Sequence, residues 1–178
     1  MNTLTRILGF IIACLLAPLT VFAIGDRMGA GLRFPLFLYQ DTIYGISLIP
    51  VWREISYVTS GIIGDRSALS ILTWALGTAL LLVAAGYLTY SRDDGITAIR
   101  KPLALLIAGG ALAYLLSCVL QYGPLLHGPA GLAIPIGVPL IFAVAGYILK
   151  VEDEETEGEP DDDGEPGDDD GEEIERDE

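Results

Sequence analysis

The sequence predicts an all-α integral membrane protein: a four-helix transmembrane bundle with a disordered acidic tail. Three observations lead to this prediction. Hydrophobic residues make up 52% of the 178 residues, and the mean hydropathy is +0.51. Four long apolar runs contain no charged residue and no histidine. The charged residues gather between these runs and at the carboxyl end, a distribution typical of a membrane protein with a solvated appendage.

The charge distribution divides the chain into two parts. Residues 1–151 hold nine basic and six acidic side chains, whereas residues 152–178 hold one and eighteen, which together give the net charge of −14. We therefore predict a membrane domain over 1–151 and a separate acidic tail over 152–178.

Each apolar run is long enough for a transmembrane helix. About 20 apolar residues span a hydrocarbon core of about 30 Å, and a helix satisfies its own backbone hydrogen bonds in lipid. The predicted helices cover about residues 7–24, 69–90, 102–121 and 132–149.

The first run has a second interpretation. Arg6, the apolar stretch after it and the small residue Ala23 together resemble a secretory signal peptide. The apolar stretch is longer than the usual 7–15 residues of a signal core. A retained helix is therefore favoured, and cleavage stays open as the alternative.

The segment 25–68 is predicted to lie outside the membrane. Strand-like runs on both sides of a turn at 40–42 indicate a β-hairpin, or a re-entrant loop on the bilayer surface. Residues 52–63 then form a short interfacial helix with Trp52 at headgroup level. A fifth span over 34–52 would bury Asp41 in lipid at a cost of about 2.5–3.5 kcal/mol, so four spans are preferred.

Basic residues predict the orientation of the bundle. Arg6 precedes the first run, Arg92, Arg100 and Lys101 lie between the second and third, and Lys150 follows the fourth. Because short cytoplasmic loops are enriched in Lys and Arg, we predict a multi-pass protein of the cell membrane with both termini in the cytoplasm.

No catalytic, cofactor-binding or metal-binding constellation is predicted. His127 is the only histidine and has no carboxylate or cysteine near it in the sequence, while Cys14 and Cys118 lie within apolar runs. No P-loop, dinucleotide or HExxH motif occurs. The runs also lack the ionisable groups on which proton-coupled and ion-coupled transporters usually depend. We therefore expect a protein that is not an enzyme, needs no cofactor and binds no nucleic acid.

Small residues predict close helix packing. Gly109, Ala113 and Ser117 recur every four residues along the third run, and Ala75 and Ala79 do so along the second. Such stripes let helix backbones approach each other. They serve either packing within the bundle or formation of an oligomer.

The fourth run contains a predicted helix break. Pro135, Gly137 and Pro139 lie close together, and a proline within a helix removes a backbone hydrogen bond. Because broken helices line the substrate sites of some transporters, the alternative function is a small-solute transporter or channel that uses this break.

The tail has the composition of a disordered segment. It consists almost entirely of Asp, Glu, Gly and Pro, with Ile174 as its one aliphatic residue, so it cannot bury apolar surface. Its Asp-rich stretches do not fit the ligand spacing of a calcium-binding loop. A polyanion of this kind is suited to docking a basic protein partner.

The chain resembles a family of small four-helix membrane proteins of halophilic archaea that has no assigned activity. It holds eight Arg, only two Lys and the acidic tail. The similar stretches are 73–77, 93–98 and 133–137, within residues 70–149. The resemblance implies a location and a topology but no reaction.

The preferred hypothesis is therefore a non-enzymatic accessory or scaffold component of the cell membrane. Its partners are the lipid bilayer and a protein that binds the external segment or the acidic tail.

Overall fold

The structure is a computed structural model that describes residues 3–25, 28–91, 96–128 and 131–151. The predicted acidic tail, and with it the prediction of disorder, lies outside these residues. The described chain forms five helices and six strands, which in chain order are α1 (Thr3–Leu16), β1 (Thr20–Ile24), β2 (Gly29–Arg33), β3 (Phe37–Thr42), β4 (Gly45–Pro50), α2 (Val51–Thr59), α3 (Asp65–Tyr90), α4 (Ile96–Tyr122), β5 (His127–Gly128), β6 (Gly131–Ile134) and α5 (Gly137–Lys150).

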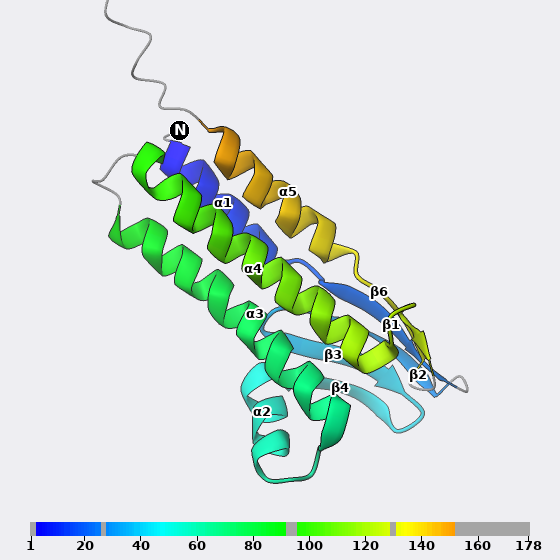
Figure 1. Ribbon diagram of the computed structural model, residues 1–178. Coiled ribbons are helices and arrows are strands. Elements are labelled where there is room, and N and C mark those ends of the chain that lie inside the picture. The colour runs from blue at the N-terminus through cyan, green and yellow to red at the C-terminus, as the bar shows by residue number, and fades with distance from the viewer. Residues whose placement is uncertain (1–2, 26–27, 92–95, 129–130, 152–178) are drawn as a thin grey trace, which may run out of the picture.

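The helices and the sheet occupy different ends of the molecule. Helices α1, α3, α4 and α5 lie side by side at one end, and the sheet lies against the other ends of α3 and α4 (Figure 1). The sheet is antiparallel throughout, with strand order β4-β3-β2-β1-β6-β5. Helix α2 packs against α3 beyond the sheet (Figure 1).

The prediction of an all-α four-helix bundle was wrong. A helix forms within each of the four apolar runs, but a six-stranded sheet is built between and around them. The sheet takes residues from the first and fourth runs as well as from the segment 25–68. The described part of the chain is therefore a mixed α and β fold.

The first run divides into a helix and a strand. Helix α1 ends at Leu16, close to Pro18, a residue that has no N–H to continue a helix. Thr20 to Ile24 then form β1, which pairs with β2 on one side and β6 on the other. These two partners satisfy the backbone groups that we expected a longer helix to satisfy within itself.

The fourth run divides in the opposite order. Gly131–Ile134 is strand β6, and α5 begins only at Gly137. Pro135 therefore lies between a strand and a helix, and Pro139 lies in the first turn, where an N–H has no partner within the helix. The predicted break within a helix is not present.

The external segment contains a hairpin and a short helix. Strands β3 and β4 are joined at residues 43–44, later than the predicted turn at 40–42, and α2 begins directly after Pro50. The hairpin is not a separate unit, because β3 also pairs with β2.

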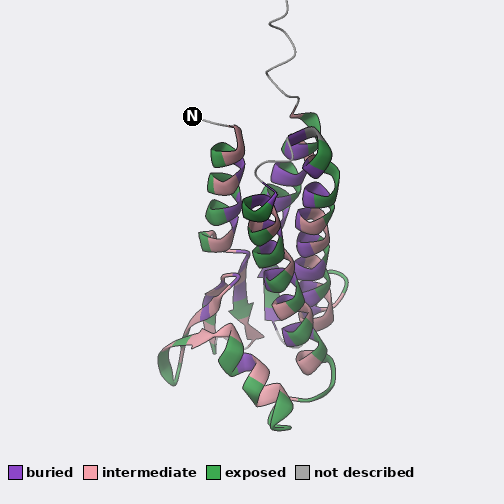
Figure 2. Ribbon diagram, turned by 90° about the vertical axis from the view of Figure 1, so that its left-hand side faces the viewer, coloured by how far each residue is buried: buried purple, intermediate pink, exposed green. Residues whose placement is uncertain are grey.

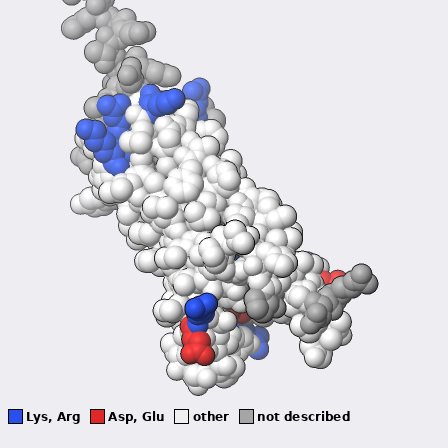
Figure 3. Space-filling view, turned by 45° about the vertical axis from the view of Figure 1, so that its right-hand side comes forward, with Lys and Arg blue, Asp and Glu red and all other residues white. Residues whose placement is uncertain are grey.

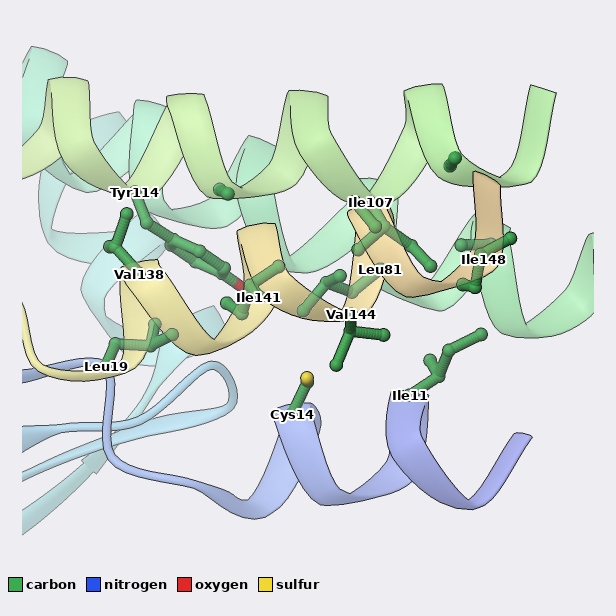
Figure 4. Packing of buried hydrophobic residues seen from close by; sticks show 14 of the residues in the cluster. Ile11, Cys14, Leu19, Leu81, Ile107, Tyr114, Val138, Ile141, Val144 and Ile148 are labelled. Atoms are coloured by element: carbon green, nitrogen blue, oxygen red, sulfur yellow. The ribbon is translucent and has the colours of Figure 1, made fainter. Parts of the chain in front are cut away.

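One hydrophobic core joins the helices to the sheet. Ile11 from α1, Leu81 from α3, Ile107 from α4 and Ile141 from α5 point toward one another (Figure 4). Phe22 and Leu38 extend the same cluster into the sheet. Burial is concentrated on the faces that these elements turn toward each other, while much of the outer helix surface is exposed (Figure 2).

Two helices have the dimensions of membrane spans. Helix α3 and residues 98–122 of α4 are long and apolar enough to cross a membrane, by length and composition. Helices α1 and α5 are apolar but have only 14 residues each.

Candidate functional site

Polar side chains are buried where the sheet meets the helices. The central group, which we name the Arg33 cluster, consists of Arg33 on β2, Glu54 on α2, Ser70 and Trp74 on α3, and Ser117 on α4. It joins four elements that are far apart in the sequence. The cluster is therefore the most polar part of an otherwise apolar interior.

Arg33 lies at the centre of this cluster. It is the last residue of β2, and its side chain is only 9% exposed because that position of the strand faces the helices. Its Nη1 donates a hydrogen bond of 3.4 Å to the Ser117 hydroxyl, and its guanidinium lies 5.1 Å from the centre of the Trp74 ring. This distance is typical of a cation–π contact. Among the described residues, its buried Nε has no hydrogen-bond partner.

Ser70 and Ser117 connect the two long helices. The Ser70 hydroxyl donates to the Ser117 carbonyl oxygen at 2.9 Å, and the Ser117 hydroxyl donates to the Ser70 carbonyl oxygen at 2.8 Å. The two hydroxyl oxygens also lie 3.1 Å apart. The pair fixes the packing of α3 against α4.

Glu54 brings a carboxyl group into the same region. It lies on α2 and is only 7% exposed. Burial raises the pKa of this carboxyl above its ordinary value of 4.5, and the positive charge of Arg33 partly offsets the rise. Arg33 and Glu54 thus compensate part of each other's cost of burial.

A second set of polar contacts holds the turn between β2 and β3. Trp74 Nε1 donates to the carbonyl oxygen of Phe34 at 3.0 Å, and the Thr78 hydroxyl donates to that of Pro35 at 2.6 Å. The Tyr114 hydroxyl donates to Thr78 Oγ1 at 3.1 Å. Two side chains of α3 thus replace water as partners of this turn, and Tyr114 of α4 bonds one of them.

The contacts of the cluster connect elements of secondary structure to one another. Beside it, Thr20 Oγ1 and Cys118 Sγ lie 3.2 Å apart and connect β1 to α4. In the described ranges, no group of three or more His, Cys, Asp or Glu side chains has the arrangement of a metal site. His127 lies on β5, and its side chain is exposed.

The predicted packing residues fall into two sets. Ala113 and Ser117 are buried and Gly109 is half-buried, with Gly109 packing near Leu80 of α3. In contrast, Ala75 is only half-buried and Ala79 is exposed. Other residues of α3 contact α4, namely Ser70, Gly77, Thr78 and Leu81.

The two long helices approach each other closely at two glycines that lie outside the predicted small-residue stripes. A Cβ at Gly77 would lie 2.8 Å from Tyr114 Cε1 and 3.1 Å from the Gly110 carbonyl oxygen. A Cβ at Gly110 would lie 3.3 Å from the Gly77 carbonyl oxygen. The spacing of small residues indicated close packing but not the α3 residue at the contact.

Two open hollows lie elsewhere on the surface. One, of about 230 Å³, lies between α1 and α3 and is lined by Leu4, Thr5, Leu8, Leu88 and Thr89. The other, of about 350 Å³, lies at the β3–β4 hairpin, with Gln40 and Ser47 in its lining. Neither hollow is lined by a residue of the Arg33 cluster.

In comparisons with protein-family models, curated proteins and solved structures, nothing matches this chain. The resemblance to a family of membrane proteins of halophilic archaea therefore stays a prediction from the sequence.

Proposed function

We propose that the chain is a multi-pass protein of the cell membrane that serves as a non-enzymatic accessory or scaffold component. The observation that carries the membrane proposal is the distribution of charge along the helices. Basic side chains gather at one end of the molecule, next to a broad uncharged surface (Figure 3). Arg6 lies near the start of α1, Arg100 and Lys101 near the start of α4, and Lys150 at the end of α5, and these helix ends lie together (Figure 1). Charged side chains of both signs appear again at the end that carries the sheet and α2 (Figure 3).

Large apolar side chains cover the uncharged surface of the two long helices. On α3 and α4, the exposed ones are Leu69, Leu72, Leu76, Leu82, Val83, Leu105, Leu112 and Leu116. Burying apolar surface is worth about 25 cal/mol per Å², and soluble monomers rarely expose contiguous apolar patches larger than a few hundred Å². A surface of this kind is suited to lipid.

The basic end fits the cytoplasmic side of the membrane. Short cytoplasmic loops are enriched in Lys and Arg. The first residue of α1 and the last residue of α5 both lie at this end (Figure 1). The proposal therefore places both termini in the cytoplasm and the sheet with α2 at the outer side.

Two tyrosines provide a matched test of this orientation. Tyr44 in the β3–β4 hairpin is 91% exposed, and Tyr90 at the basic end of α3 is 90% exposed. Tyr44→Cys and Tyr90→Cys are treated in intact cells with a membrane-impermeant maleimide. We expect labelling only at position 44, and labelling only at position 90 would reverse the orientation. The wild-type chain is the blank, because Cys14 and Cys118 are buried.

The accessory role is supported by a firmly attached outer unit with exposed apolar side chains. Arg33 and Ser117 connect the sheet to α4, and α2 packs against α3. This unit exposes Tyr44, Ile46, Trp52 and Ile62. Aromatic residues are enriched in the buried centres of protein interfaces, so these side chains are suited to a protein partner outside the membrane.

A photo-crosslinking residue in place of Trp52 tests whether a protein partner binds this surface. In native membranes, we expect one stoichiometric crosslinked protein, which is lost when Ile62→Asp is added to the same chain. A crosslinker at Leu112 on the apolar face of α4 is the control and captures no such protein. Failure to capture any stoichiometric partner from position 52 would remove the accessory role but not the membrane location.

The transport alternative loses its structural basis. It depended on a break within the fourth predicted helix, whereas Pro135, Gly137 and Pro139 lie at the junction of β6 and α5.

A further inference from the structure

The face of the sheet turned away from the helices carries a continuous apolar row. Cross-strand pairing aligns Ile134, Val21, Leu32, Tyr39 and Leu48 across five neighbouring strands. We name these five residues the outer row. Because side chains alternate along a strand, their neighbours Phe22, Arg33, Leu38 and Ala133 face the helices and are buried.

Hydrogen bonds to the helices place the inner strands at the depth of the proposed membrane. Helix α4 rises about 25 Å from Lys101 to Cys118, at about 1.5 Å per residue, and Cys118 Sγ lies 3.2 Å from Thr20 Oγ1 of β1. Val21 follows one residue later, about 3.3 Å further along the strand. Val21, the outer-row residue on β1, therefore lies within about 30 Å of the basic end, a distance equal to the thickness of the hydrocarbon core.

The turn between β2 and β3 reaches deeper still. Its Pro35 carbonyl oxygen is bound by Thr78, which lies about 18 Å along α3 from Tyr90 at the same rise per residue. This depth is close to the middle of a bilayer, where a carbonyl group has no water to bond. The donation from Thr78 supplies the partner that the depth requires.

The two short helices leave room for the sheet at this depth. Helices α1 and α5 have 14 residues each, about 21 Å, which is shorter than a bilayer core. Each is continued at its outer end by a strand, α1 by β1 and α5 by β6 (Figure 1). Strand β1 pairs with β2 and β6, and β6 pairs with β1 over its length and with β5 at Gly131 and Leu132. Ala133 N also donates to the Leu126 carbonyl oxygen, and partners of this kind are what a backbone needs in a membrane.

Polarity rises in the next row outward. Pairing aligns Leu132, Ala23, Ala30, Asp41 and Ile46, with His127 opposite Leu132. This second row lies two residues, or about 7 Å, further along the strands. It contains the first carboxylate and the histidine of this face, as expected where acyl chains give way to headgroups.

We infer that Ile134, Val21 and Leu32 of the outer row lie against lipid acyl chains in the outer leaflet, so that part of the membrane-facing surface is β-sheet. The inference rests on the proposed membrane location. Ile134 is exposed, and Val21 and Leu32 are half-buried. The inference assigns this apolar side of the sheet to lipid and leaves the hairpin tip and α2 for a protein partner.

Spin-label accessibility in nanodiscs that each hold one copy tests this inference. A nitroxide is attached to Ile134→Cys in the outer row, with Val21→Cys as a second reading of the same row. Leu132→Cys reports the second row, Leu112→Cys the lipid face of α4, and Ile43→Cys the hairpin tip. Collision rates are measured with oxygen, which concentrates in lipid, and with a water-soluble nickel chelate.

We expect the ratio of oxygen to nickel collisions at positions 134 and 21 to match that at 112, several-fold above position 43. The ratio at position 132 should lie between the ratios at positions 112 and 43. A water-like ratio at 134 and 21, with a lipid-like ratio at 112, would overturn the inference while leaving the membrane location intact. Shielding of 134 from both reagents would also overturn it, because protein would then cover the row. A water-like ratio at 112 would reject the membrane location itself.

Discussion

The Thr78 hydroxyl donates a hydrogen bond of 2.6 Å to the carbonyl oxygen of Pro35 and so ties the middle of α3 to the turn between β2 and β3. Thr78 is buried and also receives a hydrogen bond from the Tyr114 hydroxyl. A single side chain thus connects the sheet to both long helices. The contact gives the carbonyl group of this turn a hydrogen-bond partner within the protein.

Replacing Thr78 tests the strength of this connection. Thr78→Val keeps the shape of the side chain but leaves the Pro35 carbonyl without this donor, which costs about 1–3 kcal/mol for a buried group. The free energy of unfolding is measured in micelles by circular dichroism. Thr73→Val is the control, since the Thr73 hydroxyl bonds only the Leu69 carbonyl of its own helix. An equal loss in both variants would contradict the role given to Thr78.

Two glycines of α3 provide a matched test of the helix contact. At Gly77 an added Cβ would meet the Tyr114 ring and the backbone of Gly110, whereas at Gly86 nothing lies within 4 Å. We expect Gly77→Ala to lower the unfolding free energy by about 1–3 kcal/mol through overpacking. Gly86→Ala should be neutral or slightly stabilising. A destabilisation of the same size at both positions would rule out the close contact at Gly77.

The charge of Arg33 is expected to stabilise the contact between the sheet and the helices. Arg33→Met keeps much of the volume but removes the donor to Ser117 and the positive charge that offsets the burial of Glu54. We expect a loss on the order of 2 kcal/mol at neutral pH, below the range for a buried pair in direct contact. Arg53→Met is the control, because Arg53 is exposed beside Tyr57. The measurement is thermal unfolding in micelles. A loss of stability no larger than that of Arg53→Met would show that Arg33 does not stabilise the contact between sheet and helices.

Glu54 gives the stability a pH dependence of known sign. Its pKa is raised by burial, so the folded chain binds this proton more tightly than the unfolded chain. The resulting stabilisation is complete below the ordinary value of 4.5 and is lost as the pH rises through the raised pKa. Glu54→Gln stays neutral throughout. We therefore expect the variant to gain stability relative to wild type as the pH rises from about 4 toward about 7, and a constant difference would contradict the assignment.

The sequence located helices but not their ends. Apolar length predicted helices within all four runs, and α3 and α4 do extend over the second and third. The sequence predicts a helix through Ile24 because the residues of β1 are as apolar as those of α1. Only pairing with β2 and β6 makes residues 20–24 a strand, and β6 lies more than 100 residues away in the sequence. Local composition contains no information about such a partner.

The buried polar cluster was missed for a similar reason. Arg33 and Glu54 belong to the segment 25–68, which the sequence predicts to lie outside the membrane. Alternation in Leu32, Arg33 and Phe34 was a signal that one face of this strand is buried, but it did not show which face. The fold decides this, because pairing of Thr20 with Arg33 turns both side chains toward α4.

Alkaline extraction tests the central claim, that the exposed leucines of α3 and α4 lie in lipid. Membranes from cells that express the chain are washed with carbonate at high pH, which removes proteins that do not span the bilayer. We predict that the chain stays in the membrane pellet and enters solution only with detergent. Recovery of the folded chain in the supernatant, as a monomer without detergent, would contradict the membrane location and the lipid contact of the sheet together.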